Sequence, residues 1–115
     1  MNAILDATVE SFEQFVRAAS FMEPIVVVFH ASWCAPCQAM KPILERLAES
    51  LKFRLVRVDV GRHGAIALQT SVRSVPTVQV YKNGHAVTVM VGGATEEKLR
   101  KFLISAGVTQ GALDV

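Results

Sequence analysis

The chain has little cysteine and no excess of charge of either sign. Only two of its 115 residues are cysteines, and its 12 basic and 10 acidic residues give a net charge of +2. The charges are scattered, and no run of Lys or Arg is long enough to form a basic patch. This balance argues against a nucleic-acid-binding protein, and we expect no nucleic acid among its partners.

Long hydrophobic runs are also missing. The longest unbroken apolar stretch is Pro24 to Phe29, far short of the ~20 residues that a membrane span needs. The segment Met1 to Asp6 lacks the charged and apolar regions of a signal peptide. The sequence therefore predicts a cytoplasmic protein without membrane contact. In that reducing compartment, two closely spaced cysteines are more often catalytic than structural.

The order of strand-like and helix-like segments favours an α/β fold. The chain is 51% hydrophobic, and a single domain of this length buries about two-thirds of the surface of its unfolded form. Asn83-Gly84 marks a hairpin between the last two strands. We expect a mixed central sheet of about five strands flanked by about four helices. Strands are predicted at residues 3–5, 25–29, 53–60, 78–81 and 86–91, and helices at 9–20 (with Thr8 as N-cap), 34–51, 65–70 and 95–106.

These elements place the domain boundary near the C-terminus. Gly107 is typical of the residue that ends a helix. We therefore expect the folded domain to span residues 1–107, and residues 108–115 to form a C-terminal tail.

Both cysteines lie in one motif, where a buried strand meets a helix. The thiolate is the nucleophile in disulfide exchange, and a helix N-terminus lowers a cysteine pKa from about 8.5 to between about 3.5 and 7.5. Cys34 has that position, so we expect it to be the attacking thiol. Cys37 lies one turn inside the helix and is expected to be the less exposed, resolving thiol. Pro36 suits a first helical turn, and Trp33 offers a flat apolar face beside the sulfur.

Two other interpretations of the cysteines stay open at this point. Cys34 and Cys37 could be buried as small hydrophobic side chains. They could also bind a metal together with His30, but a structural zinc site normally needs four ligands. The other two histidines, His63 and His85, lie in distant predicted loops. We expect no metal site.

Several separated motifs resemble those of the thioredoxin family. The stretch Trp33-Cys34-Ala35-Pro36-Cys37 is similar to the family's Trp-Cys-Gly-Pro-Cys, and Pro42 matches a proline inside the active-site helix. Val75-Pro76-Thr77 is similar to the family's cis-proline segment, Lys82-Asn83-Gly84 to its hairpin turn, and Gly92 to a glycine near its active site. The resemblance covers roughly residues 3–106, and it implies the thioredoxin fold.

The resemblance also implies a docking surface for substrates. The Val75-Pro76 peptide bond is expected to be cis and to pack against the cysteine pair. The Val75 backbone would then pair with an extended substrate segment, as a short added strand. Trp33, Val75, Pro76 and Gly92 are expected to form this flat, apolar surface.

Three positions depart from the family pattern around the cysteines. Val28 stands where the family usually has a buried aspartate, and Leu55 where it often has the lysine partner of that aspartate. Joint replacement by apolar residues is physically coherent, because losing one partner alone leaves an unpaired buried charge that costs several kcal/mol. His30 stands where the family often has a tryptophan, and it could titrate near neutral pH and influence Cys34. A polar side chain at a partly exposed strand end is the competing interpretation.

The implied function is that of a protein-disulfide reductase, a general dithiol reductant of protein disulfides. The dipeptide Ala35-Pro36 adds no charge near the Cys34 thiolate, which favours the reducing end of the redox scale. The chain is expected to bind no cofactor, to receive electrons from NADPH through thioredoxin reductase, and to act as a monomer on disulfide-containing substrate proteins. The alternatives are an oxidase or isomerase in an oxidising compartment, and a chaperone-like binding module that uses the fold to hold a partner.

Overall fold

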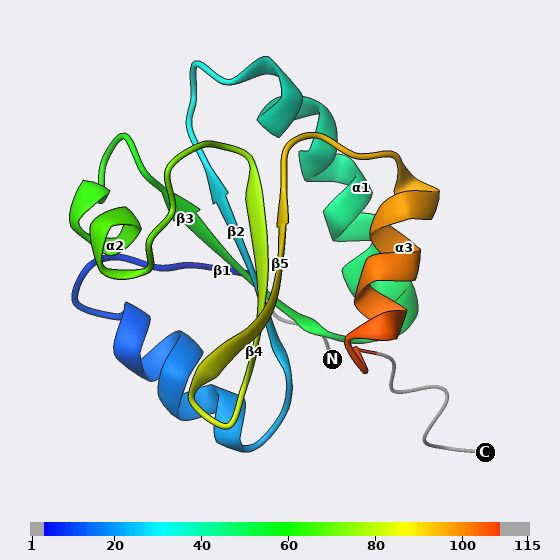
Figure 1. Cartoon of the computed structure of the whole chain (residues 1–115), viewed down its shortest axis with the longest axis horizontal. Helices are drawn as coiled ribbons and strands as arrows, with labels where there is room; N and C mark the ends of the chain where they lie inside the picture. The colour runs from blue at the N-terminus through cyan, green and yellow to red at the C-terminus, as the bar shows by residue number, and fades with distance from the viewer. Residues whose placement is uncertain (1–3, 109–115) are drawn as a thin grey trace.

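A five-stranded mixed sheet forms the centre of the protein in a computed structural model, which describes residues 4–108 (Figure 1). The strand order is β1-β3-β2-β4-β5. β1, β3 and β2 are parallel, whereas β4 runs antiparallel to β2, and β5 antiparallel to β4. The predicted five strands are confirmed, with bounds β1 Ile4–Asp6, β2 Ile25–His30, β3 Arg54–Asp59, β4 Thr77–Lys82 and β5 His85–Val91.

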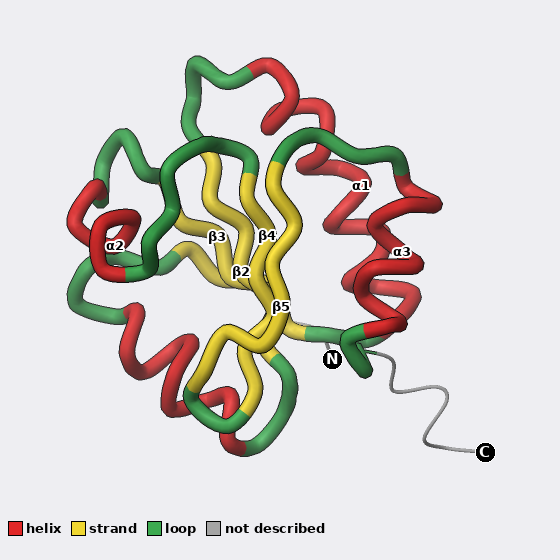
Figure 2. Tube along the Cα trace, in the orientation of Figure 1, coloured by secondary structure: helices red, strands yellow, loops and turns green. Residues whose placement is uncertain are grey.

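Helices cover both faces of this sheet (Figure 2). The helices α1 (Ala35–Leu51) and α3 (Glu96–Ser105) pack on one face. The helix α2 (Gly64–Gln69) and the N-terminal helical segment (residues 13–21) pack on the other. The α/β fold with four helical segments therefore agrees with the sequence-based prediction.

The central strand β2 explains why its sequence shows no alternation of apolar and polar residues. Its residues 25–29 are all buried, with at most 6% of any of them exposed. Val26 and Val28 face α1 and α3, whereas Val27 and Phe29 face α2 and the N-terminal helical segment. Both faces of the strand are covered, so every position is apolar.

The N-terminal helical segment differs from the regular helix that its spacing predicts. It is a π-helix over Glu13–Ala18, followed by a 3₁₀ turn over Ala19–Phe21. Thr8 does cap the turns before it, because Thr8 Oγ1 accepts a hydrogen bond from the Ser11 backbone N–H at 3.2 Å. The apolar stripe packs as expected, with Val16 fully buried. Apolar spacing predicts which side is buried but does not distinguish α-helical from π-helical winding.

The chain turns back onto the core directly after α3. Gly107 has a positive φ of 80° after α3, and the Val108 backbone N–H donates to Leu103 O at 2.9 Å. Val108 is only 2% exposed, because this turn folds it back onto the core beside α3. The rest of the predicted tail, residues 109–115, lies outside the described residues. Within residues 4–108, no helix is both long and apolar enough to cross a membrane.

Candidate active site

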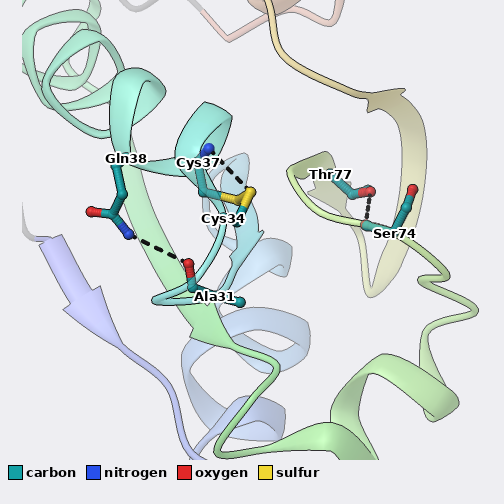
Figure 3. The surroundings of a disulfide bond; sticks show 6 residues. All are labelled: Ala31, Cys34, Cys37, Gln38, Ser74 and Thr77. Atoms are coloured by element: carbon teal, nitrogen blue, oxygen red, sulfur yellow. Dashed lines mark hydrogen bonds between the residues drawn. A yellow bond between two sulfur atoms is a disulfide. The ribbon is translucent and has the colours of Figure 1, made fainter.

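The two cysteines lie where β2 ends and α1 begins, and they form a disulfide (Figure 3). Cys34 is the N-cap of α1, with Pro36 in the first turn. The backbone N–H of Cys37 donates to Cys34 Sγ at 3.2 Å. Free N–H groups and the positive end of the helix dipole favour negative charge at this position. The local geometry therefore stabilises a thiolate on Cys34 when the disulfide is reduced.

In the disulfide form both cysteines are buried to the same extent. Each is 5% exposed, so the expectation that Cys37 is less exposed than Cys34 is wrong for this state. The pair packs with Ala31, and the partly buried Val60 and Val75 cover it. Cysteine side chains are small and a single bond joins the two sulfur atoms, so the same neighbouring residues shield both cysteines from solvent.

The loop before β4 lies against the cysteine pair. The Val75-Pro76 peptide bond is cis, which confirms the expectation from the resemblance. Val75 packs on the cysteines, and Gly92 lies beside Pro76, because the Gly92 N–H donates to Pro76 O at 2.8 Å. Figure 3 shows this loop with the hydrogen bond from Thr77 Oγ1 to Ser74 O, at 2.7 Å.

The predicted docking residues are therefore neighbours in space although they are distant in sequence. Trp33 precedes Cys34 and is 74% exposed, an unusual exposure for a large aromatic side chain. A Cβ placed on Gly93 would lie 3.5 Å from Pro36 Cβ, so the turn after β5 approaches the first turn of α1. Val75 thus contacts the sulfur pair, Gly92 is hydrogen-bonded to Pro76, and Trp33 directly precedes Cys34.

A cavity of about 510 Å³ adjoins Cys37, lined by residues of β1, β2, α1, β3 and the loop after β3. Its apolar lining includes Val28, which is 6% exposed, and Leu55, which is 1% exposed. We call these two residues the apolar floor. Neither side chain can accept or donate a proton, so the floor beneath Cys37 carries no acid–base group.

The strand register adds a charged residue to the surroundings of this floor. Val28 and Leu55 belong to the same core cluster, but in the ladder Leu55 lies opposite Val26, and the residue opposite Val28 is Arg57. A cation therefore lies across from Val28. The expectation that apolar residues alone replace the family's charged pair did not include this cation. The motif spacing did not reveal it, because the register depends on how the apolar faces of β2 and β3 match, and one motif alone does not specify that match.

Arg57 is paired with carboxylates from two other elements. Its guanidinium donates to both carboxylate oxygens of Asp6, at 2.9 and 3.0 Å, and to Glu45 Oε2 at 3.0 Å. The Asp6 hydrogen bonds raise the pKa of Arg57, and those of Arg57 lower the pKa of Asp6. The long Arg side chain thus directs its charge to β1 and α1, and the floor stays apolar without an unpaired charge.

His30 lies at the end of β2 and lines the same cavity as Cys37. It is two residues beyond Val28, so its side chain leaves the strand on the same face. Burial is the largest influence on its pKa and lowers it, while Asp59, opposite it in the ladder, acts to raise it. His30 is therefore half-buried beside the reactive centre, and it is not simply an exposed strand end.

Comparison with known proteins agrees with this geometry. The thioredoxin family model matches residues 3–105. The chain belongs to the thioredoxin family. It is 36% identical over 102 residues to thioredoxin C-2 of Corynebacterium nephridii, covering 87% of this chain and 93% of that protein. It is 39% identical over 89 residues to the mitochondrial thioredoxin of Bos taurus, covering 76% of this chain but only 54% of that longer protein.

Solved structures show the same relationship. A mutant thioredoxin from Halobacterium salinarum NRC-1 superimposes with a TM-score of 0.76 and 28% identity, covering 90% of this chain and 88% of that one. The protein is thus a thioredoxin-type disulfide oxidoreductase, with Cys34–Cys37 as its redox-active pair. No cluster of three or more His, Cys, Asp or Glu residues suited to a metal ion occurs among residues 4–108, and Cys34, Cys37 and His30 form none.

Sequence reasoning missed two charged residues of this thioredoxin site. Arg57 and Asp59 both line the cavity, together with Leu55. These three residues alternate along β3, so a period of two would have placed them on one face. What the sequence alone did not reveal is that this face meets His30 and Cys37.

Proposed function

We propose that this thioredoxin-family oxidoreductase is a general reductant of protein disulfides. The observation that carries the proposal is the position of Cys34, a sulfur at a helix N-terminus that accepts a backbone hydrogen bond. This environment favours the thiolate form of a cysteine, and the thiolate is the nucleophile that attacks a disulfide.

The reaction proceeds by two exchanges. The Cys34 thiolate attacks one sulfur of a substrate disulfide, forms a mixed disulfide, and releases the other substrate sulfur as a thiolate. Cys37 then attacks Cys34 Sγ, which forms the Cys34–Cys37 bond and releases the second substrate sulfur. The substrate gains two electrons, and the protein's dithiol loses two.

The surface around Cys34 suits an extended polypeptide. Trp33 presents exposed apolar area, and Val75 packs against the sulfur pair. We expect the Val75 backbone to pair with the substrate segment, while Gly92 leaves room because it has no side chain. Backbone pairing with few side-chain requirements fits a reductant that acts on many protein disulfides.

The remaining parts of the proposal follow from family membership. Electrons would come from NADPH through a thioredoxin reductase, and the chain itself would bind no cofactor. We expect a cytoplasmic monomer that exchanges disulfides with its substrate proteins one at a time.

The proposal is tested by NADPH-coupled reduction of insulin disulfides in the presence of thioredoxin reductase. The wild-type protein should support turnover, and Cys34→Ser should abolish it. An Arg46→Lys variant, altered on the exposed side of α1, is a matched control that should retain full activity. Full activity of Cys34→Ser would contradict the mechanism, and a partner-dependent effect that survives in the Cys34→Ser/Cys37→Ser double variant would favour the binding-module alternative.

A further inference from the structure

The second exchange requires a proton acceptor that the apolar floor does not supply. Cys37 must lose its proton to attack Cys34, yet an unperturbed thiol ionises only near about pH 8.5 and burial raises that value. Val28 and Leu55 lie where a base would be most useful, and neither has a titratable group. Another group reaching the same cavity must accept the proton for the step to be fast at neutral pH.

The cavity contains few groups able to act as a base. The Lys and Arg side chains that line it have hydrogen-bond donors and no acceptor, and the Asp6 carboxylate is held by two hydrogen bonds from Arg57. Asp59 lies opposite His30 and not opposite Val28, and its Oδ1 accepts a hydrogen bond from the Gly61 N–H at 2.9 Å, which holds this carboxylate toward the turn after β3. Two histidines remain. The titratable groups that line the cavity are Asp6, His30, Cys37, Lys41, Arg57, Asp59, Arg62 and His63.

His30 is better placed than His63. It belongs to the same strand as Val28 and extends from the same face, two residues nearer to the cysteines. Its backbone is fixed in the sheet, because its carbonyl accepts a hydrogen bond from the Val60 N–H at 2.9 Å. His63 lies outside the sheet, in the loop that precedes α2. A general base needs a fixed position relative to the proton it accepts.

We propose that His30 is the proton acceptor for Cys37 in the resolving step, in place of a buried carboxylate. This inference rests on the proposed function. The Cys37 S–H proton passes to an imidazole nitrogen of His30, directly or through a water in the cavity. The electron pair of the Cys37 sulfur forms the bond to Cys34 Sγ, and the pair of the broken bond leaves with the substrate thiolate. The imidazolium then releases its proton to solvent.

The charges around His30 suit this cycle. Burial, Arg57 on β3 and Lys41 on α1 lower its pKa, whereas Asp59 on β3 and Asp6 on β1 act to raise it. Arg62 and His63, from the loop after β3, complete the polar side of the cavity. With the pKa below its usual value, the imidazole is neutral at pH 7 and ready to accept a proton. Asp59 stabilises the imidazolium that forms.

The test separates the two exchanges with a chromogenic aromatic disulfide, dithiobis(nitrobenzoate), and needs no protein substrate or reductase. Mixing it in excess with the reduced protein releases two nitrothiolates. The first release reports attack by Cys34 and depends on reagent concentration, whereas the second reports attack by Cys37 and does not. His30→Gln should slow the second release at least about tenfold at pH 7 and leave the first within about twofold. The intact first phase also shows that the variant is folded.

The pH profile and chemical rescue give readouts that a merely structural role would not produce. In the wild-type protein, the rate of the second release should increase as the pH rises through the pKa of His30. This increase, the His30 limb of the pH profile, should be absent in His30→Gln. Added imidazole should restore the second phase in His30→Ala. The matched control is His63→Gln, which should keep the wild-type profile.

The inference is overturned if His30→Gln keeps the wild-type rate and limb in the second phase, if it slows both phases equally, or if His63→Gln removes the limb instead. Failure to reduce insulin in the coupled assay, with both nitrothiolate phases intact, would count against the proposed function and not against His30.

Discussion

An aspartate at position 28 should destabilise the protein in a pH-dependent way, because it would place a carboxylate in the apolar floor. Val28 is 6% exposed, and losing this buried side chain costs about 1.5 kcal/mol. Burying an ionised carboxylate adds at least about 1.5 kcal/mol more, even where water in the cavity reaches it. Arg57 can stabilise the new carboxylate only weakly, because Asp6 and Glu45 already pair with it. We therefore expect Val28→Asp to lower the free energy of unfolding by at least about 3 kcal/mol at pH 8.

The sign of the pH dependence follows from burial. The pKa of a buried carboxyl is raised in the folded state, so the charge penalty is absent at low pH and grows as the pH rises through that folded pKa. Urea denaturation of the oxidised protein should show a midpoint at least about 2 M below wild type at pH 8 and a smaller difference at pH 4.5. Val28→Thr, of the same shape, is the control and should give a pH-independent cost of about 1–2 kcal/mol. A midpoint for Val28→Asp within about 0.5 M of wild type at pH 8 would refute the assignment of an apolar floor.

Two further predictions concern exposed features of the site. Trp33→Ala should lower kcat/KM for insulin reduction about fivefold or more, because Trp33 is 74% exposed and free to contact substrate. The urea midpoint should not change, and an unchanged kcat/KM would show that Trp33 is not part of the docking surface. Asp6→Asn should cost about 0.5–1 kcal/mol at pH 7 in urea denaturation, and the cost should disappear as the pH falls through the folded pKa of Asp6, which the Arg57 hydrogen bonds lower. A cost that persists at pH 2 would show that Asp6 does not act through its charge.

Most of the fold could be predicted because its elements carry strong local signals. The five-residue run 25–29 has no polar position, which a strand covered on both faces requires. Asn83-Gly84 sits at the β4–β5 turn, where both residues have positive φ. The winding of residues 13–21 and the burial of Val108 depend on packing against distant elements, and local patterns do not encode them.

The chemistry of the first exchange was also visible in the sequence, whereas that of the second was not. A Cys-x-x-Cys at a helix start predicts a nucleophilic sulfur from local geometry alone. The surroundings of Cys37 depend on which side chains of β3 meet β2, and the motifs pointed to Leu55 but not to Arg57. Only the assembled sheet showed that a cation lies opposite Val28 and that His30 shares the cavity.

The assignment of Cys34 as attacking sulfur and Cys37 as resolving sulfur is tested most directly by trapping the mixed disulfide. Cys37→Ser should accumulate a covalent complex with a disulfide substrate, and peptide mapping by mass spectrometry should place the bond on Cys34. Cys34→Ser should accumulate none, because Cys37 lacks the helix N-cap position. A stable complex through Cys37 in Cys34→Ser, with none through Cys34 in Cys37→Ser, would contradict the assignment.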